Sequence, residues 1–247
     1  MDLKLTLRRR ALVQNADGHN IWVLNEDVRH WPAEKTALLL CDVWDKHWSR
    51  GAVDRLEPML PRMQQVVESL RAQGGQIVHA PSDTMDFYAD SAARKRAQGA
   101  PQTEVPADME HVDPPLPVDA SDDGSDTLGD KPARVWSRQH PAIAIDEECD
   151  IVTDRGAEVY SYLRHRGIEH VLIMGVHTNM CVLHRSFAIK QMVRWGIDIA
   201  LLRDLTDTMY NPAMPPYVEH DEGTRLVVEF IEKFWCASVE SKDLLGG

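Results

Sequence analysis

The chain of 247 residues lacks several features that would define its class at once. It has no run of 18 apolar residues, which argues against a membrane span. The start of the chain lacks the apolar core of a signal peptide, so we expect a cytoplasmic protein. No repeat of 20–50 residues is visible. The four cysteines are far apart and form no C-x-x-C pair, so neither a zinc site nor a disulfide framework is indicated. They are Cys41, Cys149, Cys181 and Cys236.

Positive charge is also scarce. The 27 Lys and Arg residues are outnumbered by 39 Asp and Glu residues, and the net charge is −12. This balance argues against a nucleic-acid binder and for a soluble protein. No G-x-G-x-x-G motif follows an apolar run, so a dinucleotide-binding domain is not indicated. The length fits one large α/β domain, or one domain with appendages.

Three regions differ in composition. Residues 1–30 predict an N-terminal β-hairpin extension, because leucines alternate at its start and Asp17-Gly18 marks a turn. Residues 31–240 carry the patterns of the main domain. Within them, residues 99–130 are rich in proline and acidic residues, and we expect an irregular insertion there. A lid, a subunit arm and a plain flexible loop are all open interpretations of this insertion.

Buried strands alternate with amphipathic helices along the main domain. This order predicts an α/β fold, with a mostly parallel central sheet and helices on both faces. The predicted strands cover residues 36–43, 76–81, 133–138, 171–174 and 198–204, and the predicted helices cover residues 56–73, 83–98, 157–166, 182–195 and 219–235. The carboxyl ends of parallel strands meet at one edge of the sheet, where ligands usually bind.

The stretch from Gly175 to Cys181 joins a buried strand to an amphipathic helix. Thr178 and Asn179 are N-cap residue types, so Cys181 is expected at or in the first turn of the helix. Unpaired N–H groups there favour a thiolate and can hold an oxyanion. The context is that of a nucleophile elbow, although the G-x-S-x-G pattern is absent. The alternative is a buried structural cysteine.

Two other predicted strands end in charged residues. Asp42 ends an apolar run, which is costly unless the carboxylate is paired or used, and the alternative is a structural cap. Arg138 ends the predicted strand 133–138. A carboxylate beside a thiol can accept its proton, and a cation beside both can stabilise charge. The sequence therefore predicts Asp42, Arg138 and Cys181 as catalytic residues. Candidate walls of a substrate pocket, with loop packing as the alternative, are Trp44, His47 and Trp48.

The segments Leu38-Leu-Leu-Cys-Asp42-Val43-Trp44-Asp45 and Gly175-Val-His-Thr-Asn-Met-Cys181-Val182 resemble the isochorismatase-like cysteine hydrolases, a superfamily that also holds nicotinamidases. The second segment matches the G-V-x-T-x-x-C-V signature in full. The order of elements matches from about residue 36 to residue 235. The resemblance implies a three-layer α/β/α sheet of Rossmann-like topology, and a homo-oligomer, either dimer or tetramer.

The resemblance also assigns roles to residues. It implies a Cys-Asp-Lys triad in which Asp42 is the general base and Cys181 is the nucleophile. It implies a cis peptide between Val176 and His177, and an oxyanion hole formed by the backbone N–H groups of His177 and Cys181.

Two departures from the family pattern stand out. Arg138 takes the place of the family's lysine, and an arginine supplies charge but cannot shuttle a proton. Lys131 lies nearby and is the alternative, although it precedes the predicted strand. Nicotinamidases bind a metal through an Asp-x-His pattern after the second strand, whereas Pro81–Asp86 contains no histidine. We therefore expect no metal and no cofactor, and nicotinamide is a poor substrate candidate.

These observations predict a hydrolase that cleaves a C–N bond of a small amide or ureide through a thioester acyl-enzyme. Family members that cleave the vinyl ether of isochorismate do not need the cysteine, so Cys181 favours amide chemistry. The alternative is a weak or inactive family member that binds a small molecule or a protein. The expected partners are a small-molecule substrate and further copies of the chain, with no nucleic acid and no membrane.

Overall fold

The computed structural model describes residues 1–245 and contains one eight-stranded sheet, in the order β2-β1-β8-β7-β6-β3-β4-β5. From β8 to β5 all neighbouring strands pair in parallel, and β1 pairs antiparallel with β2 and β8. The strands are β1 (Asp2–Gln14), β2 (Asn20–Pro32), β3 (Thr36–Cys41), β4 (Gln76–Ala80), β5 (Ile151–Val152), β6 (His170–Val176), β7 (Asp198–Asp207) and β8 (Ala237–Val239). The prediction of an α/β fold with a mostly parallel sheet is confirmed.

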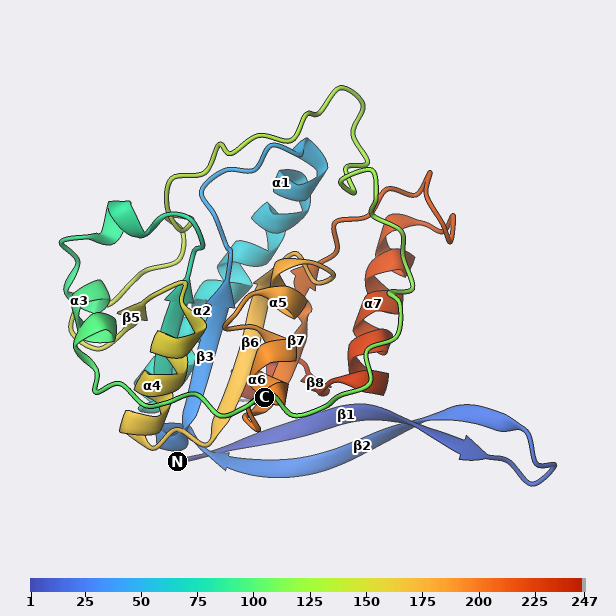
Figure 1. Cartoon of the computed structure of the whole chain (residues 1–247), viewed down its shortest axis with the longest axis horizontal. Coiled ribbons are helices and arrows are strands. Elements are labelled where there is room, and N and C mark those ends of the chain that lie inside the picture. Colours follow the sequence, from blue (N-terminus) through green and yellow to red (C-terminus); the bar gives the residue numbers. More distant parts are fainter. Residues whose placement is uncertain (246–247) are drawn as a thin grey trace.

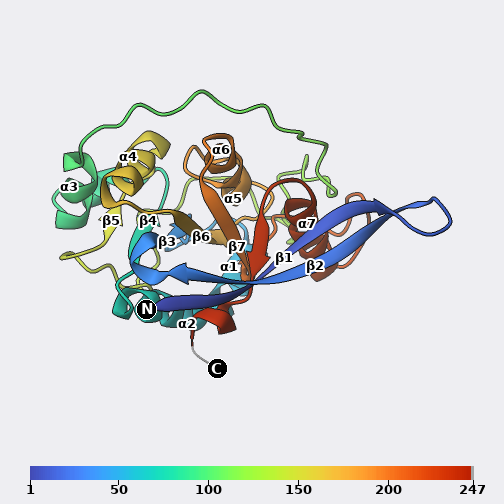
Figure 2. The same cartoon turned by 90° about the horizontal axis from the view of Figure 1, so that it is seen from below.

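Helices cover both faces of the sheet (Figure 1, Figure 2). They are α1 (Arg50–Leu56), α2 (Leu60–Ala72), α3 (Ala92–Gly99), α4 (Gly156–Arg166), α5 (Cys181–His184), α6 (Ile189–Arg194) and α7 (His220–Phe234), with short 3-10 helices η1 (Ala33–Lys35), η2 (Glu57–Met59), η3 (Met85–Tyr88) and η4 (Ser241–Leu244). No helix within residues 1–245 is long and apolar enough to cross a membrane.

Side chains along β3 point alternately to the two faces of the sheet, and this alternation explains the three layers. This strand is apolar and fully buried, as expected for a central parallel strand. Leu38 and Leu40 belong to one core with side chains of α2, whereas Leu39 and Cys41 belong to the other core with side chains of α4 to α7. Both faces of β3 are therefore covered, and only its carboxyl end is left to form a site.

The N-terminal hairpin of β1 and β2 extends beyond the rest of the sheet. β1 and β2 pair over their whole length and project beyond the body in both views (Figure 1, Figure 2). Leu3 and Leu5 are buried at the base of the hairpin. The pairing of Arg8 with Ser238 joins β1 to β8, so the hairpin extends the main sheet.

The insertion and the segment after it are irregular. Between α3 and β5, the structure contains no helix or strand. The strand predicted over residues 133–138 is therefore wrong, and β5 takes its place by pairing with Val78 and His79 of β4. The apolar residues of this segment predicted a strand, but Trp136 does not enter the sheet. Its ring stacks on that of Trp44, with the centroids 4.1 Å apart.

The helix predicted after Cys181 is also interrupted. It consists of α5 and α6, separated by residues 185–188, because the backbone of Arg185 is extended with φ −59° and ψ 152°. Gly156 meets this break, and its N–H donates to Ser186 Oγ at 3.0 Å. A Cβ at Gly156 would lie 1.9 Å from the carbonyl oxygen of Ser186, so α4 approaches this closely only with glycine.

Candidate active site

Asp42 is the buried centre of the site at the end of β3. Its Oδ1 accepts a hydrogen bond from the Ser82 N–H at 2.7 Å, and its Oδ2 accepts one from Arg185 Nε at 2.9 Å. The Cys181 thiol lies next to this carboxylate and helps to lower its pKa. The backbone of Asp42 is left-handed, with φ +49°, a conformation that aspartate tolerates better than most residues. The structure thus brings together Asp42 and Cys181, as the sequence predicts.

Burial dominates the electrostatics of this pair. It raises the pKa of Asp42 above its ordinary value, although the charge of Arg185, the neighbouring Cys181 thiol and the hydrogen bond from Ser82 oppose the rise. Burial and the charge of Asp42 raise the pKa of Cys181 well above that of an ordinary thiol. The helix N-terminus therefore does not produce a resting thiolate, contrary to the sequence-based expectation. The raised pKa favours the thiol form of Cys181 beside the Asp42 carboxylate.

The cation beside Asp42 is Arg185, and the choice of Arg138 needs correction. Within residues 1–245, neither Arg138 nor Lys131 forms an ion pair with Asp42. The Arg138 guanidinium lies over the ring of Phe87, 5.4 Å from its centroid, and its backbone pairs with Asp45. Arg138 does not lie beside the Asp42 carboxylate, because the segment that carries Arg138 is not a strand of the sheet. Sequence reasoning missed Arg185, although it lies only four residues after Cys181.

The turn before Cys181 carries the two backbone N–H groups that are predicted to form an oxyanion hole. The peptide between Val176 and His177 is cis, at the bond that the resemblance implies. The His177 carbonyl accepts hydrogen bonds from the N–H groups of Met180 and Val182. The His177 N–H is directed at the Cys181 thiol and works against the rise of its pKa.

Gly175 allows this turn to sit against β3. Its φ is +123°, and a Cβ there would lie 2.0 Å from the carbonyl oxygen of Cys41. The turn is fixed from behind by Asn179, whose side chain bonds both the N–H and the carbonyl of Met209. The Thr178 N–H donates to the Asp207 carbonyl at 2.8 Å. These contacts hold Cys181 in place relative to the sheet.

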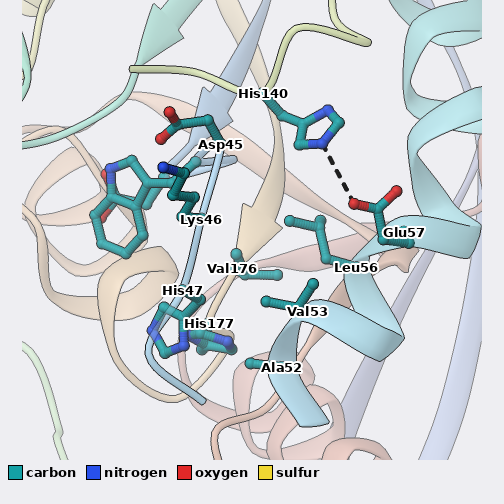
Figure 3. A pocket seen from close by; sticks show the side chains of 12 residues that line it. Asp45, Lys46, His47, Ala52, Val53, Leu56, Glu57, His140, Val176 and His177 are labelled. Atoms are coloured by element: carbon teal, nitrogen blue, oxygen red, sulfur yellow. Dashed lines mark ion pairs between the residues drawn. The ribbon is translucent and has the colours of Figure 1, made fainter. Parts of the chain in front are cut away.

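A small pocket opens next to Asp42 (Figure 3). Side chains of α1 lie across from the loop that follows β3, with Val176 between them. The lining residues are Asp42, Trp44, Asp45, Lys46, His47, Ala52, Val53, Leu56, Glu57, His140, Val176 and His177. Two of the predicted wall residues, Trp44 and His47, line the pocket. Trp48 packs against the ring of His47 and is not among the described lining residues.

Two of the imidazoles that line the pocket, those of His47 and His177, have pKa values below the ordinary value of histidine. Burial lowers the pKa of His47 to about 4. Burial, followed by the proximity of His47, lowers the pKa of His177 to about 3. The two rings meet edge to face, with the centroids 4.9 Å apart. They can therefore offer hydrogen bonds to a substrate without adding charge. Within residues 1–245, no group of three or more metal-ligating side chains has the geometry of a metal site.

No protein-family model and no curated protein matches the chain. Solved structures do match it. A cysteine hydrolase from Pseudomonas syringae pv. phaseolicola 1448A superposes with a TM-score of 0.54 at 14% identity, over 87% of this chain and 93% of that one. An isochorismatase from Pseudomonas putida KT2440 gives a TM-score of 0.52 at 11% identity, over 85% and 89% of the two chains.

The chain has the isochorismatase-like fold. The recognition drawn from the two sequence segments is thus confirmed at the level of the fold. Because the sequence identities are so low, the matches show the fold alone. The chemistry of this chain has to be argued from its own residues.

Proposed function

We propose that this protein is a cysteine hydrolase that cleaves a C–N bond of a small amide or ureide. One observation carries the proposal. The carboxylate of Asp42, buried at the edge of a pocket, lies next to the Cys181 thiol and accepts a hydrogen bond from the Arg185 guanidinium. A buried acid in contact with a thiol and a cation is costly to maintain for structure alone, and it is suited to proton transfer.

In the first half of the reaction, Cys181 attacks the substrate carbonyl. The thiol proton passes to Asp42 as the S–C bond forms, so no free thiolate is needed beforehand. The oxyanion of the tetrahedral adduct is held by the backbone N–H groups of His177 and Cys181. Collapse of the adduct breaks the C–N bond. The leaving nitrogen takes the proton from Asp42 and departs as ammonia or an amine.

In the second half, water attacks the thioester on Cys181. Asp42 accepts a proton from this water, and the C–S bond then breaks to give the carboxylic or carbamic acid. The sulfur recovers the proton from Asp42, which restores the resting pair. Arg185 contributes its positive charge throughout, because it stabilises the ionised form of Asp42 whenever that group has to act as a base.

A screen of small amides and ureides, with detection of released ammonia, tests this function. We expect turnover of at least one compound by the wild-type protein and none by Cys181→Ser or Cys181→Ala, with the circular dichroism spectrum unchanged. Cys149→Ser is the matched control, since Cys149 is exposed and distant in the fold, and it should retain activity. Turnover that survives in Cys181→Ala contradicts the covalent mechanism. Tight binding of a compound without turnover favours the binding-module alternative.

A further inference from the structure

The outer strand of the N-terminal hairpin, β2, is an open edge of the sheet. It spans 13 residues and pairs with β1 alone. Figure 1 shows β2 along the lower side of the molecule, with no other segment beyond its outer edge. We propose that this edge pairs with β2 of a second copy of the chain, antiparallel about a two-fold axis at Val28. The inference concerns assembly and does not depend on the proposed hydrolase function.

The backbone of β2 offers the hydrogen-bonding groups that such a pairing needs. In an antiparallel ladder, two residues that face each other point their N–H and C=O groups either toward one another or away. The Thr6 N–H points away from β2, because it donates to Asp243 Oδ2 at 2.7 Å. Val28 faces Thr6, so its own N–H and C=O point to the open edge. The same holds for every second residue of β2, and within residues 1–245 no backbone group of another segment bonds to these edge atoms.

β2 also lacks features that usually keep an edge strand unpaired. Residues 21–31 contain no lysine, proline or glycine, and their pairing with β1 runs without a bulge. Alternate residues of a strand share a face, and three apolar side chains on one face of β2 are exposed. They are Trp22, Leu24 and Val28. An axis at Val28 places this side chain against its own copy and Leu24 against Pro32 of the partner subunit, so pairing covers part of this apolar surface.

The charges of β2 select the register of this pairing. In the single chain, Arg29 Nη2 lies 2.6 Å from Asp27 Oδ2, and the two side chains are 62% and 60% exposed. An axis at Val28 places Asp27 opposite Arg29 of the partner subunit, and symmetry repeats this contact. Asp27 and Arg29 then form a non-hydrogen-bonded pair, in which facing side chains come closest. Two copies of the strand are therefore complementary in charge at this axis.

Other axes fit the charges less well. An axis at Glu26, Asp27 or Arg29 sets that residue against its own copy, and like charges that face each other are destabilising. An axis at Leu24 or Asn25 sets both acidic residues against apolar side chains. Among these axes and the one at Val28, only the axis at Val28 places charged residues opposite partners of the other sign.

Charge exchange tests the register. Asp27→Arg sets arginine against arginine, and Arg29→Asp sets aspartate against aspartate, so either variant alone should weaken the dimer about tenfold or more in Kd. An equimolar mixture of the two variants restores opposite charges at both contacts and should form a heterodimer close to the wild type in affinity. Sedimentation velocity over a range of protein concentrations measures each case. Asp86→Arg, the same change on an exposed residue of η3, is the matched control and should dimerise like the wild type.

A disulfide trap locates the axis. The exposed Cys149 is first replaced by serine. In the proposed dimer, the two Cα atoms at position 28 lie about 5.5 Å apart, which is within the range of a disulfide. Val28→Cys should therefore give a covalent dimer on a non-reducing gel after mild oxidation. Glu26→Cys is the matched control, because its two copies lie four residues apart along the strands, at about 13 Å, and should not form a disulfide.

Val28→Pro separates the open edge from the fold. Proline removes the N–H that points to the edge and leaves the ladder with β1 intact. We expect this variant to be monomeric with an unchanged circular dichroism spectrum, whereas Val28→Ala, which keeps the N–H, should remain a dimer.

Four results overturn the inference. They are a monomeric wild-type protein, a dimer of unchanged affinity in both Asp27→Arg and Val28→Pro, a mixture of the two charge variants that binds no more tightly than each variant alone, and a disulfide in Glu26→Cys with none in Val28→Cys.

Discussion

Arg185 Nε lies 2.9 Å from Asp42 Oδ2, and Arg185 is the fourth residue after Cys181, whose thiol lies next to the same carboxylate. Cys181 and Arg185 thus come from one short segment, α5 and its C-cap. Asp42 directly follows the neighbouring strand β3. In this arrangement, the helix break after His184 is part of the site, because it turns the arginine back toward Asp42.

Arg185→Met is expected to lower kcat/KM by about a hundredfold or more. A unit charge at about 4 Å and an effective dielectric constant of about 20 is worth on the order of 4 kcal/mol, and a hundredfold loss requires about 2.7 kcal/mol of it. Arg185→Lys should keep more activity, since the charge is retained. Arg138→Met is the matched control and should remain close to the wild type. An inactive Arg138→Met with an active Arg185→Met would restore Arg138 as the functional cation.

The pH dependence gives an independent measure of the same contact. Arg185 opposes the rise of the pKa of Asp42, so its removal should raise this pKa further. A base must be ionised to act, so activity falls as the pH drops through its pKa. The acidic limb of kcat/KM should therefore move to higher pH in Arg185→Met and stay in place in Arg138→Met. An unmoved limb in Arg185→Met would show that Asp42 is not the titrating base.

Asp42→Asn should change the reactivity of Cys181 and the turnover in opposite directions. The negative charge of Asp42 raises the pKa of Cys181, so its loss should lower that pKa and speed alkylation by iodoacetamide at a fixed alkaline pH. Turnover should fall by about 10²- to 10⁴-fold, because the proton acceptor is lost. Peptide mass spectrometry measures alkylation at each cysteine, with Cys149, whose pKa is raised to about 11, as the internal reference. Slower alkylation of Cys181 would mean that Asp42 activates the resting thiol.

Asp150 is expected to stabilise the fold and to take no part in the chemistry. It accepts hydrogen bonds from His79 Nε2 at 3.0 Å and from Arg71 Nη2 at 2.6 Å. Although burial acts in the other direction, these bonds lower its pKa to about 2. A depressed pKa means that the stabilisation is present above the unfolded value near 4 and is lost as the pH falls toward 2. By linkage it amounts to about 2 kcal/mol.

Asp150→Asn should therefore reduce the free energy of unfolding at pH 7, by about 3 kcal/mol if its partners are left unpaired. It should also flatten the dependence of stability on pH between 4 and 2. Urea titrations at several pH values measure both effects. The exposed Asp86 offers a control of the same chemistry, and Asp86→Asn should unfold like the wild type. A pH dependence that is unchanged in Asp150→Asn would exclude this carboxylate as its source.

The sequence predicts much of the fold because its signals are local. Buried strands such as β3 and β6 are continuous apolar runs, and the charged residue after β3 marks the carboxyl end of the sheet. A parallel sheet then brings the ends of adjacent strands together, and β3 and β6 are paired neighbours. The meeting of Asp42 with Cys181 follows from that topology alone.

The cation beside Asp42, Arg185, could not be found in this way, for two reasons. The segment before Arg138 has the composition of a strand, but Trp136 stacks on Trp44 through a contact that no local pattern encodes. The apolar spacing after Cys181 is helical throughout, so it hides the break at Arg185. Both errors concern residues whose positions depend on tertiary contacts, and both affect the choice of the cation.

The acyl-enzyme is the most direct test of the central claim that Cys181 is a nucleophile served by Asp42. The wild-type protein is mixed with the best amide found in the screen, quenched in acid within milliseconds to seconds, and weighed by intact mass spectrometry. We predict a mass increase equal to the acyl group, located on the peptide that contains Cys181, absent in Cys181→Ser, and formed more slowly in Asp42→Asn. Turnover without any acylated Cys181 under single-turnover conditions, or an adduct on another residue that forms at the catalytic rate, would contradict the account.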